Sequence, residues 1–230
     1  MDFYKKVKRL YHTNTLGLAI KGQIGDYLSQ IGKVLNSEKI IYNSWTFAIF
    51  QRAALEIAPV VVKKILALFP DIKNVVDLGC GTGVYVAEFR KRNIDAEGFE
   101  YSEYARKMAL ELNKIKVHSF DLTKPFELKR NFDLAICIEV AEHLDPELGE
   151  KLVNVCCKYA KIVVFSAGQP GQKGQGHINL QPKSYWIEKF SKRGFSYDEE
   201  KSKDLEQFLR KNLVRGFWVA NNVCIYSRKE

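Results

Sequence analysis

The sequence lacks any unbroken apolar run of the roughly 18 to 20 residues that a membrane-spanning helix requires. Its first residues also lack the apolar stretch of a secretory signal, because Lys5, Lys6, Lys8 and Arg9 interrupt them. We therefore expect a cytoplasmic protein without a membrane span.

Cysteine is scarce and unpatterned. No C-x-x-C pair occurs, so the sequence favours neither a disulfide framework nor a thiolate zinc site, and we expect reduced, mostly buried thiols. The five cysteines are Cys80, Cys137, Cys156, Cys157 and Cys224. Internal repeats and low-complexity tracts are also lacking.

Charge of one sign is not concentrated in any long segment. Lys and Arg number 36 against 27 Asp and Glu, for a net charge of +9, but basic and acidic residues are interleaved in most segments. This balance admits an anionic partner such as nucleic acid without requiring one. The 230 residues are enough for one sizeable core.

Downstream of Asn74, strand-like apolar runs alternate with helical patterns, which is typical of parallel βαβ units. We predict an α/β fold with a doubly wound, mostly parallel, Rossmann-like sheet of seven strands, antiparallel at its C-terminal end. The predicted strands are 74–78, 96–100, 117–121, 132–140, 161–167, 195–198 and 218–227. The predicted helices are 84–92, 103–113, 146–159, 183–192 and 200–213, and the glycine- and glutamine-rich stretch 168–176 is predicted to be a loop.

Residues 1–73 are predicted to form an N-terminal helical extension, and residues 74–230 the Rossmann-like domain. Apolar residues recur at helical spacing over 45–69, and Pro59 is expected to divide this stretch or to start a second helix. Either a cap over the carboxyl edge of the sheet or a helix covering the core fits this pattern.

The stretch VVDLGCGTG, residues 75–83, delivers a strand into a glycine-rich turn. Glycines there let the backbone approach a ligand, and the helix that follows offers free N–H groups. A dinucleotide fingerprint requires glycine at position 84, where Val84 stands, so nicotinamide binding fits poorly.

Residues 76–83 resemble the first motif of the class I S-adenosylmethionine-dependent methyltransferases. Further matches follow in order, at the second strand end GFEYS (98–102), at FDL (120–122) and at FDLAICIEVAEHL (132–144), which resembles the EVxEH segment of small-molecule O-methyltransferases. The resemblance implies S-adenosylmethionine as cofactor, with Glu100 at the ribose and Asp121 near the adenine. The residues it assigns to the cofactor are Asp77, Gly79, Cys80, Gly81, Gly83, Glu100, Tyr101, Asp121, Leu122, Ile138 and Glu139.

Methyl transfer also needs a base or a metal near the end of the fourth strand. We predict catalytic roles for Glu142, His143 and His177, since adjacent parallel strands end side by side and His177 follows the fifth strand. Glu139, Glu142, His143 and His177 together form a carboxylate and imidazole set that suits Mg²⁺ or Mn²⁺. This set resembles the metal site of small-RNA 2′-O-methyltransferases. Helix capping by Glu142 and His143, without metal, is the favoured alternative.

The acceptor is least constrained. We expect an oxygen or nitrogen atom of a small molecule, natural product or saccharide, with Tyr11, His12, Tyr42 and Trp45 as candidates for its pocket. A metal-dependent RNA 2′-O-methyltransferase is the alternative. A nicotinamide-dependent oxidoreductase and a non-catalytic binding module are less favoured. The sequence does not indicate the oligomeric state.

Overall fold

The computed structural model describes residues 44–229. The candidate pocket residues Tyr11, His12 and Tyr42 lie outside the described residues, as does the side chain of Trp45. No helix in the described part of the chain combines the length and apolarity needed to cross a membrane.

A seven-stranded sheet forms the centre of the molecule, with strand order β3-β2-β1-β4-β5-β7-β6. Strands β1 to β5 run parallel in neighbouring pairs, whereas β7 is antiparallel to both β5 and β6. The predicted fold class is therefore confirmed. The strands are β1 (Asn74–Leu78), β2 (Asp95–Glu100), β3 (His118–Ser119), β4 (Phe132–Ile138), β5 (Ala160–Ser166), β6 (Phe195–Tyr197) and β7 (Cys224–Arg228).

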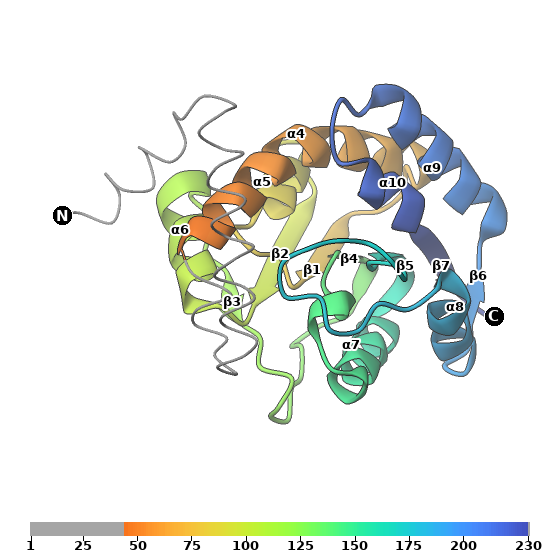
Figure 1. Cartoon of the computed structure of the whole chain (residues 1–230). Helices are drawn as coiled ribbons and strands as arrows, with labels where there is room; N and C mark the ends of the chain where they lie inside the picture. The colour runs from red at the N-terminus through yellow and green to blue at the C-terminus, as the bar shows by residue number, and fades with distance from the viewer. Residues whose placement is uncertain (1–43, 230) are drawn as a thin grey trace.

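Helices cover both faces of this sheet, because successive strand residues are apolar on both sides. Val75 belongs to a core cluster with α4, α5, α9 and α10, whereas its neighbour Val76 belongs to a second cluster with α7 and α8. Figure 1 shows the first group along one side of the sheet and the second group along the other. The helices are α4 (Ser44–Leu68), α5 (Val84–Arg90), α6 (Glu103–Asn113), α7 (Pro146–Tyr159), α8 (Lys183–Ser191), α9 (Glu199–Asn212), α10 (Phe217–Asn222) and the 3₁₀ turn η1 (Ala141–His143).

Helix α4 covers the core. Val61, Val62 and Ile65 are fully buried in the same cluster as the sheet residue Val75, which matches the core-covering alternative. The expectation that Pro59 divides this stretch was wrong, because α4 is continuous through it. A proline removes only one helical hydrogen-bond donor, and burial of the surrounding turns can offset that loss.

Two predicted strands are shorter in the structure by more than two residues, and the others differ by at most two residues. The strand predicted over 117–121 shortens to the two residues of β3. The strand predicted over 218–227 begins only at Cys224, because residues 217–222 form α10, which starts after Gly216 in the left-handed region at φ 81°.

Strand β1 lies between β2 and β4, so the connections that leave the sheet here diverge to opposite sides. Ligands in open α/β sheets bind at this kind of switch point, beyond the carboxyl ends of the strands. The glycine turn and the segment after β4 both lie at this edge.

Candidate functional site

The glycine turn is built from left-handed backbone. Gly79, Gly81 and Gly83 have φ angles of 78°, 54° and 72°, which glycine adopts without the steric cost of a Cβ. The backbone N–H groups of Gly79 and Cys80 both donate to the carbonyl of Phe99, at 2.8 and 3.0 Å. The turn is thus fixed to the end of β2 by its own backbone.

Space around these glycines differs. A Cβ at Gly79 would lie 2.6 Å from a methyl of Val140, so close packing requires glycine there. A Cβ at Gly81 would meet nothing within 4 Å. The turn therefore presents open space at Gly81, where a ligand can approach the backbone.

Glu100 closes one side of the turn. Its carboxylate accepts from the N–H of Gly81 at 2.9 Å and from the N–H of Ser102 at 2.7 Å. Burial raises the pKa of Glu100, although these backbone hydrogen bonds act in the opposite direction. An acceptor-only group held beside the glycine turn suits the paired hydroxyls of a ribose.

Asp77 lies in β1, near the same edge of the sheet, and is only 3% exposed. Its Oδ2 has no hydrogen-bond partner among residues 44–229, and burial, followed by the charge of Glu100, raises its pKa. Tyr85, in the first turn of α5, is also buried, and the charges of Asp77 and Glu139 add to the burial that raises its pKa. A buried carboxylate oxygen without a donor fits the amino group of a bound amino-acid moiety.

Five other residues that the sequence assigned to the cofactor differ in their surroundings. Cys80 is buried, and burial raises the pKa of its thiol, so it lines the turn as a neutral side chain. Ile138 ends β4 opposite Ser166, and Leu122 packs against the second core cluster. Tyr101 is 58% exposed, whereas Asp121 accepts from Thr123, which lowers the pKa of Asp121 to about 2.

Glu139 is the first residue after β4 and has an unusual backbone. Its φ is 55°, which is uncommon for a residue with a side chain, and its N–H donates to the carbonyl of Ser166 at 3.0 Å. The carboxylate accepts from Asn222 at 3.0 Å and from Gln172 at 3.1 Å. Strained backbone of this kind is often found at functional sites.

Glu142, His143 and His177 come together from two segments. One ligand atom from each lies within 4.8 Å of the other two, and the two imidazole rings meet edge to face at 5.0 Å between centroids. The N–H groups of Ile178 and Asn179 donate to the carbonyl of Glu142 at 2.9 and 3.1 Å, which fixes the segment after the loop to η1. The predicted proximity of His143 and His177 is thus confirmed.

Glu142 is fully buried, and neither carboxylate oxygen has a partner of hydrogen-bonding geometry in the described part of the chain. Burial and the neighbouring charge of Glu139 raise its pKa. Glu139, also predicted as a metal ligand, is not part of the three-residue group. Three of the four predicted ligands are therefore gathered, and the fourth is held by amide side chains.

Sequence reasoning missed Gln172, Asn222 and Tyr85. The glutamine lies in a stretch that was recognised only as a loop, and the asparagine lies in a stretch assigned to a strand. Tyr85 occupies a helical position of ordinary composition. Gln172 and Asn222 are far from the motifs in sequence, whereas Tyr85 is close to the glycine motif and no local pattern distinguishes it from a core residue.

Comparisons with known proteins agree with this geometry. Residues 50–153 match the sequence family described as a methyltransferase domain. A dTDP-4-amino-2,3,4,6-tetradeoxy-D-glucose N,N-dimethyltransferase of Saccharopolyspora spinosa is 28% identical over 79 residues, which is 34% of this chain and 31% of that protein. A ubiquinone biosynthesis O-methyltransferase of Nitrosomonas europaea is 28% identical over 127 residues, 49% of this chain and 47% of that protein.

The curated relatives are thus matched over half their length or less. The fold is matched more widely. The S-adenosylmethionine-bound amino pentose methyltransferase CalS10 of Micromonospora echinaspora superimposes with a TM-score of 0.58 at 16% identity, covering 75% of this chain and 90% of the other. The glycine turn, Glu100 and Asp77 thus lie at the switch point of a fold shared with solved S-adenosylmethionine-dependent methyltransferases, and residues 50–153 match a methyltransferase domain.

Proposed function

We propose that this protein transfers the methyl group of S-adenosylmethionine to an oxygen or nitrogen atom of a small-molecule, natural-product or saccharide acceptor. The observation that carries the proposal is one continuous edge of the sheet. Asp77 and Glu100 lie with the glycine turn at its β1 and β2 end, and His143 and His177 lie beyond β4 and β5. We take the first group as the donor site and the second as the acid–base site.

The residues of the first half fit the cofactor. Glu100 offers carboxylate oxygens to the ribose hydroxyls, Asp77 offers an unpartnered oxygen to the amino group, and Gly81 leaves room for the backbone to approach. When bound, S-adenosylmethionine supplies a methyl group already activated by the positive charge of its sulfonium. The protein's task is then to align the acceptor, exclude water and remove the acceptor's proton.

His177 is the proposed base. Its Nδ1 lies 3.4 Å from the carbonyl oxygen of Gln172, which only accepts, so the neutral ring carries its proton on Nδ1 and its lone pair on Nε2. Imidazole is the side chain that most often serves as a general base in enzymes. His177 removes the proton from the attacking hydroxyl or amine, and His143 packs against its ring to fix its orientation.

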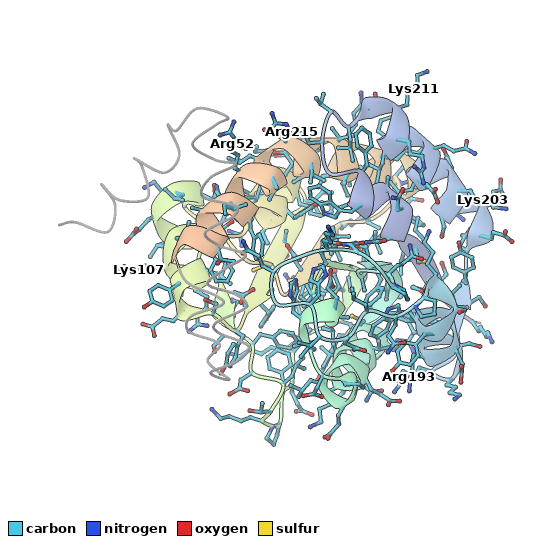
Figure 2. The ribbon with its side chains drawn as sticks, in the orientation of Figure 1. Arg52, Lys107, Arg193, Lys203, Lys211 and Arg215 are labelled. Atoms are coloured by element: carbon cyan, nitrogen blue, oxygen red, sulfur yellow. The ribbon has the colours of Figure 1, made fainter. Side chains whose placement is uncertain are left out.

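The distribution of charge supports a small acceptor. Cations labelled in Figure 2, such as Arg193 and Lys203, extend from different elements and pair with acids, namely Glu150 at 2.9 Å and Glu199 at 2.7 Å. Nucleic acid, in contrast, favours cations gathered along one face. The relatives whose names specify an acceptor include sugar methyltransferases, which also favours a saccharide or a similar metabolite.

A divalent metal would change the role of the histidines. Glu142, His143 and His177 offer one carboxylate oxygen and two imidazole nitrogens, a mixed set that suits Mn²⁺ or Mg²⁺ and would bring the protein nearer to the RNA 2′-O-methyltransferase alternative. The two histidines would then hold the metal together with Glu142, and the metal would supply Lewis-acid chemistry at this site. The likeness of residues 139–143 to the EVxEH segment of small-molecule O-methyltransferases remains part of the proposed function.

Calorimetry with S-adenosylmethionine and S-adenosylhomocysteine tests the donor. We expect binding of both, and absence of binding at millimolar concentration would overturn the proposal. Turnover against hydroxyl and amino acceptors, sugars included, is then followed by mass spectrometry with and without EDTA. Full activity in EDTA would exclude a metal requirement. A loss of activity in EDTA that Mn²⁺ restores in the wild type, but not in His177→Ala, would support a metal.

A further inference from the structure

Asn222 joins three segments that are distant in sequence. It lies at the end of α10, is 3% exposed, and donates through Nδ2 to both carboxylate oxygens of Glu139, at 3.0 and 3.3 Å. The same nitrogen donates to Oε1 of Gln172 at 2.9 Å. A carboxamide nitrogen has two protons, so this set uses both of them.

The loop 168–176 provides the other half of the network. Gln172 donates to Glu139 at 3.1 Å, and Gln169 donates to Oδ1 of Asn222 at 3.1 Å. Both polar atoms of the Asn222 side chain are thus occupied, and both partners in the loop are glutamines. The buried Asn222 and the two partly exposed glutamines satisfy one another, and a connected network of this kind favours a single arrangement.

The loop 168–176 also contacts His177, the residue that follows it. Gly174 packs directly on the imidazole, since a Cβ there would lie 2.2 and 2.3 Å from two ring atoms, and the carbonyl of Gln172 lies 3.4 Å from Nδ1. Gln172 therefore faces Asn222 with its side chain and His177 with its backbone. Any shift of Gln172 moves the environment of His177.

We propose that Asn222 is a positioning residue that latches the loop 168–176 to Glu139 and thereby places His177 beside His143. The latch consists of side-chain hydrogen bonds, so it can open without breaking a helix or a strand. Gly171 and Gly176, with φ angles of 86° and 73°, supply the backbone freedom for such movement. The functional meaning of this placement rests on the proposed methyl transfer.

Figure 1 places the loop between β5 and α8 beside α10 and over the ends of the central strands. Asn222 belongs to α10, which lies outside the sequence motifs. Its side chain nevertheless contacts Glu139, which is 83 positions away in sequence.

Trypsin cleavage after Lys173, an exposed residue of the loop, reports the latch in the full-length protein. We expect Asn222→Ala to accelerate this cleavage about tenfold, because opening of the loop limits access to the bond. Asn221→Ala is the matched control, since Asn221 is exposed and contributes only its carbonyl. Asn222→Gln, which keeps a carboxamide, should restore part of the protection. Equal cleavage rates for the wild type and Asn222→Ala would overturn the proposal.

Histidine NMR separates positioning from a general loss of structure. The chain has only four histidines, so the His177 signal can be assigned with His177→Asn. We expect this signal to move in Asn222→Ala and in Gln172→Ala, but to stay in Asn221→Ala. Gln172→Ala opens the latch from the loop side and leaves α10 unchanged, so the test survives if Asn222→Ala fails to fold. An unmoved His177 signal in both variants would contradict the proposal.

Binding of S-adenosylhomocysteine is measured on the same proteins. If the wild type does not bind it, the proposed function fails, while the cleavage and NMR comparisons still decide on the latch. If the wild type binds it and the variants show no change at Lys173 or His177, only the latch fails.

Discussion

The N–H of Gly81 donates to the carboxylate of Glu100 at 2.9 Å. This hydrogen bond joins the glycine turn to the end of the second strand across a separation of 19 residues. The two signals that the sequence presents separately therefore form one structure, in which the acid closes the side of the turn. The predicted cofactor site depends on this contact.

Glu100→Gln should weaken binding of S-adenosylhomocysteine by about tenfold or more, because a carboxamide offers one acceptor oxygen where the carboxylate offers two. Stability should also fall, by about 1 to 3 kcal/mol, because the carboxamide nitrogen cannot accept the hydrogen bond that the N–H of Gly81 or Ser102 now donates to a carboxylate oxygen. Calorimetry measures the affinity. Glu103→Gln, an exposed acid at the start of α6, is the control, and an equal loss in both variants would contradict the role of Glu100.

Gly79→Ala and Gly81→Ala should differ in stability. The added methyl at Gly79 meets Val140 at 2.6 Å in a left-handed conformation, and we expect a loss of about 2 to 4 kcal/mol. The methyl at Gly81 meets nothing, so a loss of about 1 to 2 kcal/mol is expected from backbone conformation alone. Urea denaturation measures both.

Val140→Ala provides a matched test of the clash. In the double variant with Gly79→Ala, the added methyl gains room, so the combined loss should be smaller than the sum of the two single losses. Additive losses would show that the methyl groups do not meet. Gly81→Ala, in contrast, should weaken cofactor binding, because the added methyl occupies the open space beside the turn. The loss of affinity should therefore be larger than the small change in the free energy of unfolding.

Asp77→Asn should stabilise the protein increasingly as the pH rises. Burial raises the pKa of Asp77 in the folded protein above its ordinary value of 3.8. At any pH between 3.8 and this raised pKa, the folded state binds more protons than the unfolded state. The stability of the wild type then falls with rising pH in that window, and the variant lacks this term. The Tm of Asp77→Asn minus the Tm of the wild type, measured from pH 4 to pH 8, should increase as the pH rises above about 4.

A constant difference in Tm across that range would instead indicate an effect unrelated to ionisation. The variant should also lose affinity for S-adenosylhomocysteine, because the amide replaces the oxygen that faces an amino group with a group that can donate. Gain of stability with loss of binding is the expected pattern for a buried functional carboxylate.

Gly174→Ala should displace His177 without unfolding the protein. The new Cβ would lie 2.2 Å from the ring, whereas the exposed loop position limits the cost in stability to about 1 kcal/mol. Histidine NMR and thermal unfolding measure the two effects. Lys173→Ala is the control on the neighbouring exposed residue, and a His177 signal that moves equally in both variants would contradict the contact.

The parallel core was predictable because its signals are local. Val75 and Val76 are both buried on opposite faces, and the resulting apolar runs with intervening helical patterns identify the sheet. The glycine turn was predictable for the same reason, since Gly79 and Gly83 require left-handed backbone within a short stretch.

The rest depends on tertiary contacts that local patterns do not contain. Residues 218–222 were assigned to a strand that begins with the aromatic Trp218 and the β-branched Val219, yet packing against α9 and α4 makes them helical. That single difference hid Asn222. In the same way, the residue type of Glu139 suggested a metal ligand, whereas its partners, Asn222 and Gln172, decide where its carboxylate lies.

Strand β6 pairs with β7 alone among the described strands, and β7 follows it by an entire helical segment. During synthesis, β6 and α9 therefore emerge from the ribosome before the strand that connects them to the sheet. The parallel half can assemble earlier, because β1, β2 and β4 are adjacent and complete by residue 138. We expect the cofactor half of the edge to form first and the Asn222 contacts to form last, so that an incomplete chain holds the donor site without its closing loop.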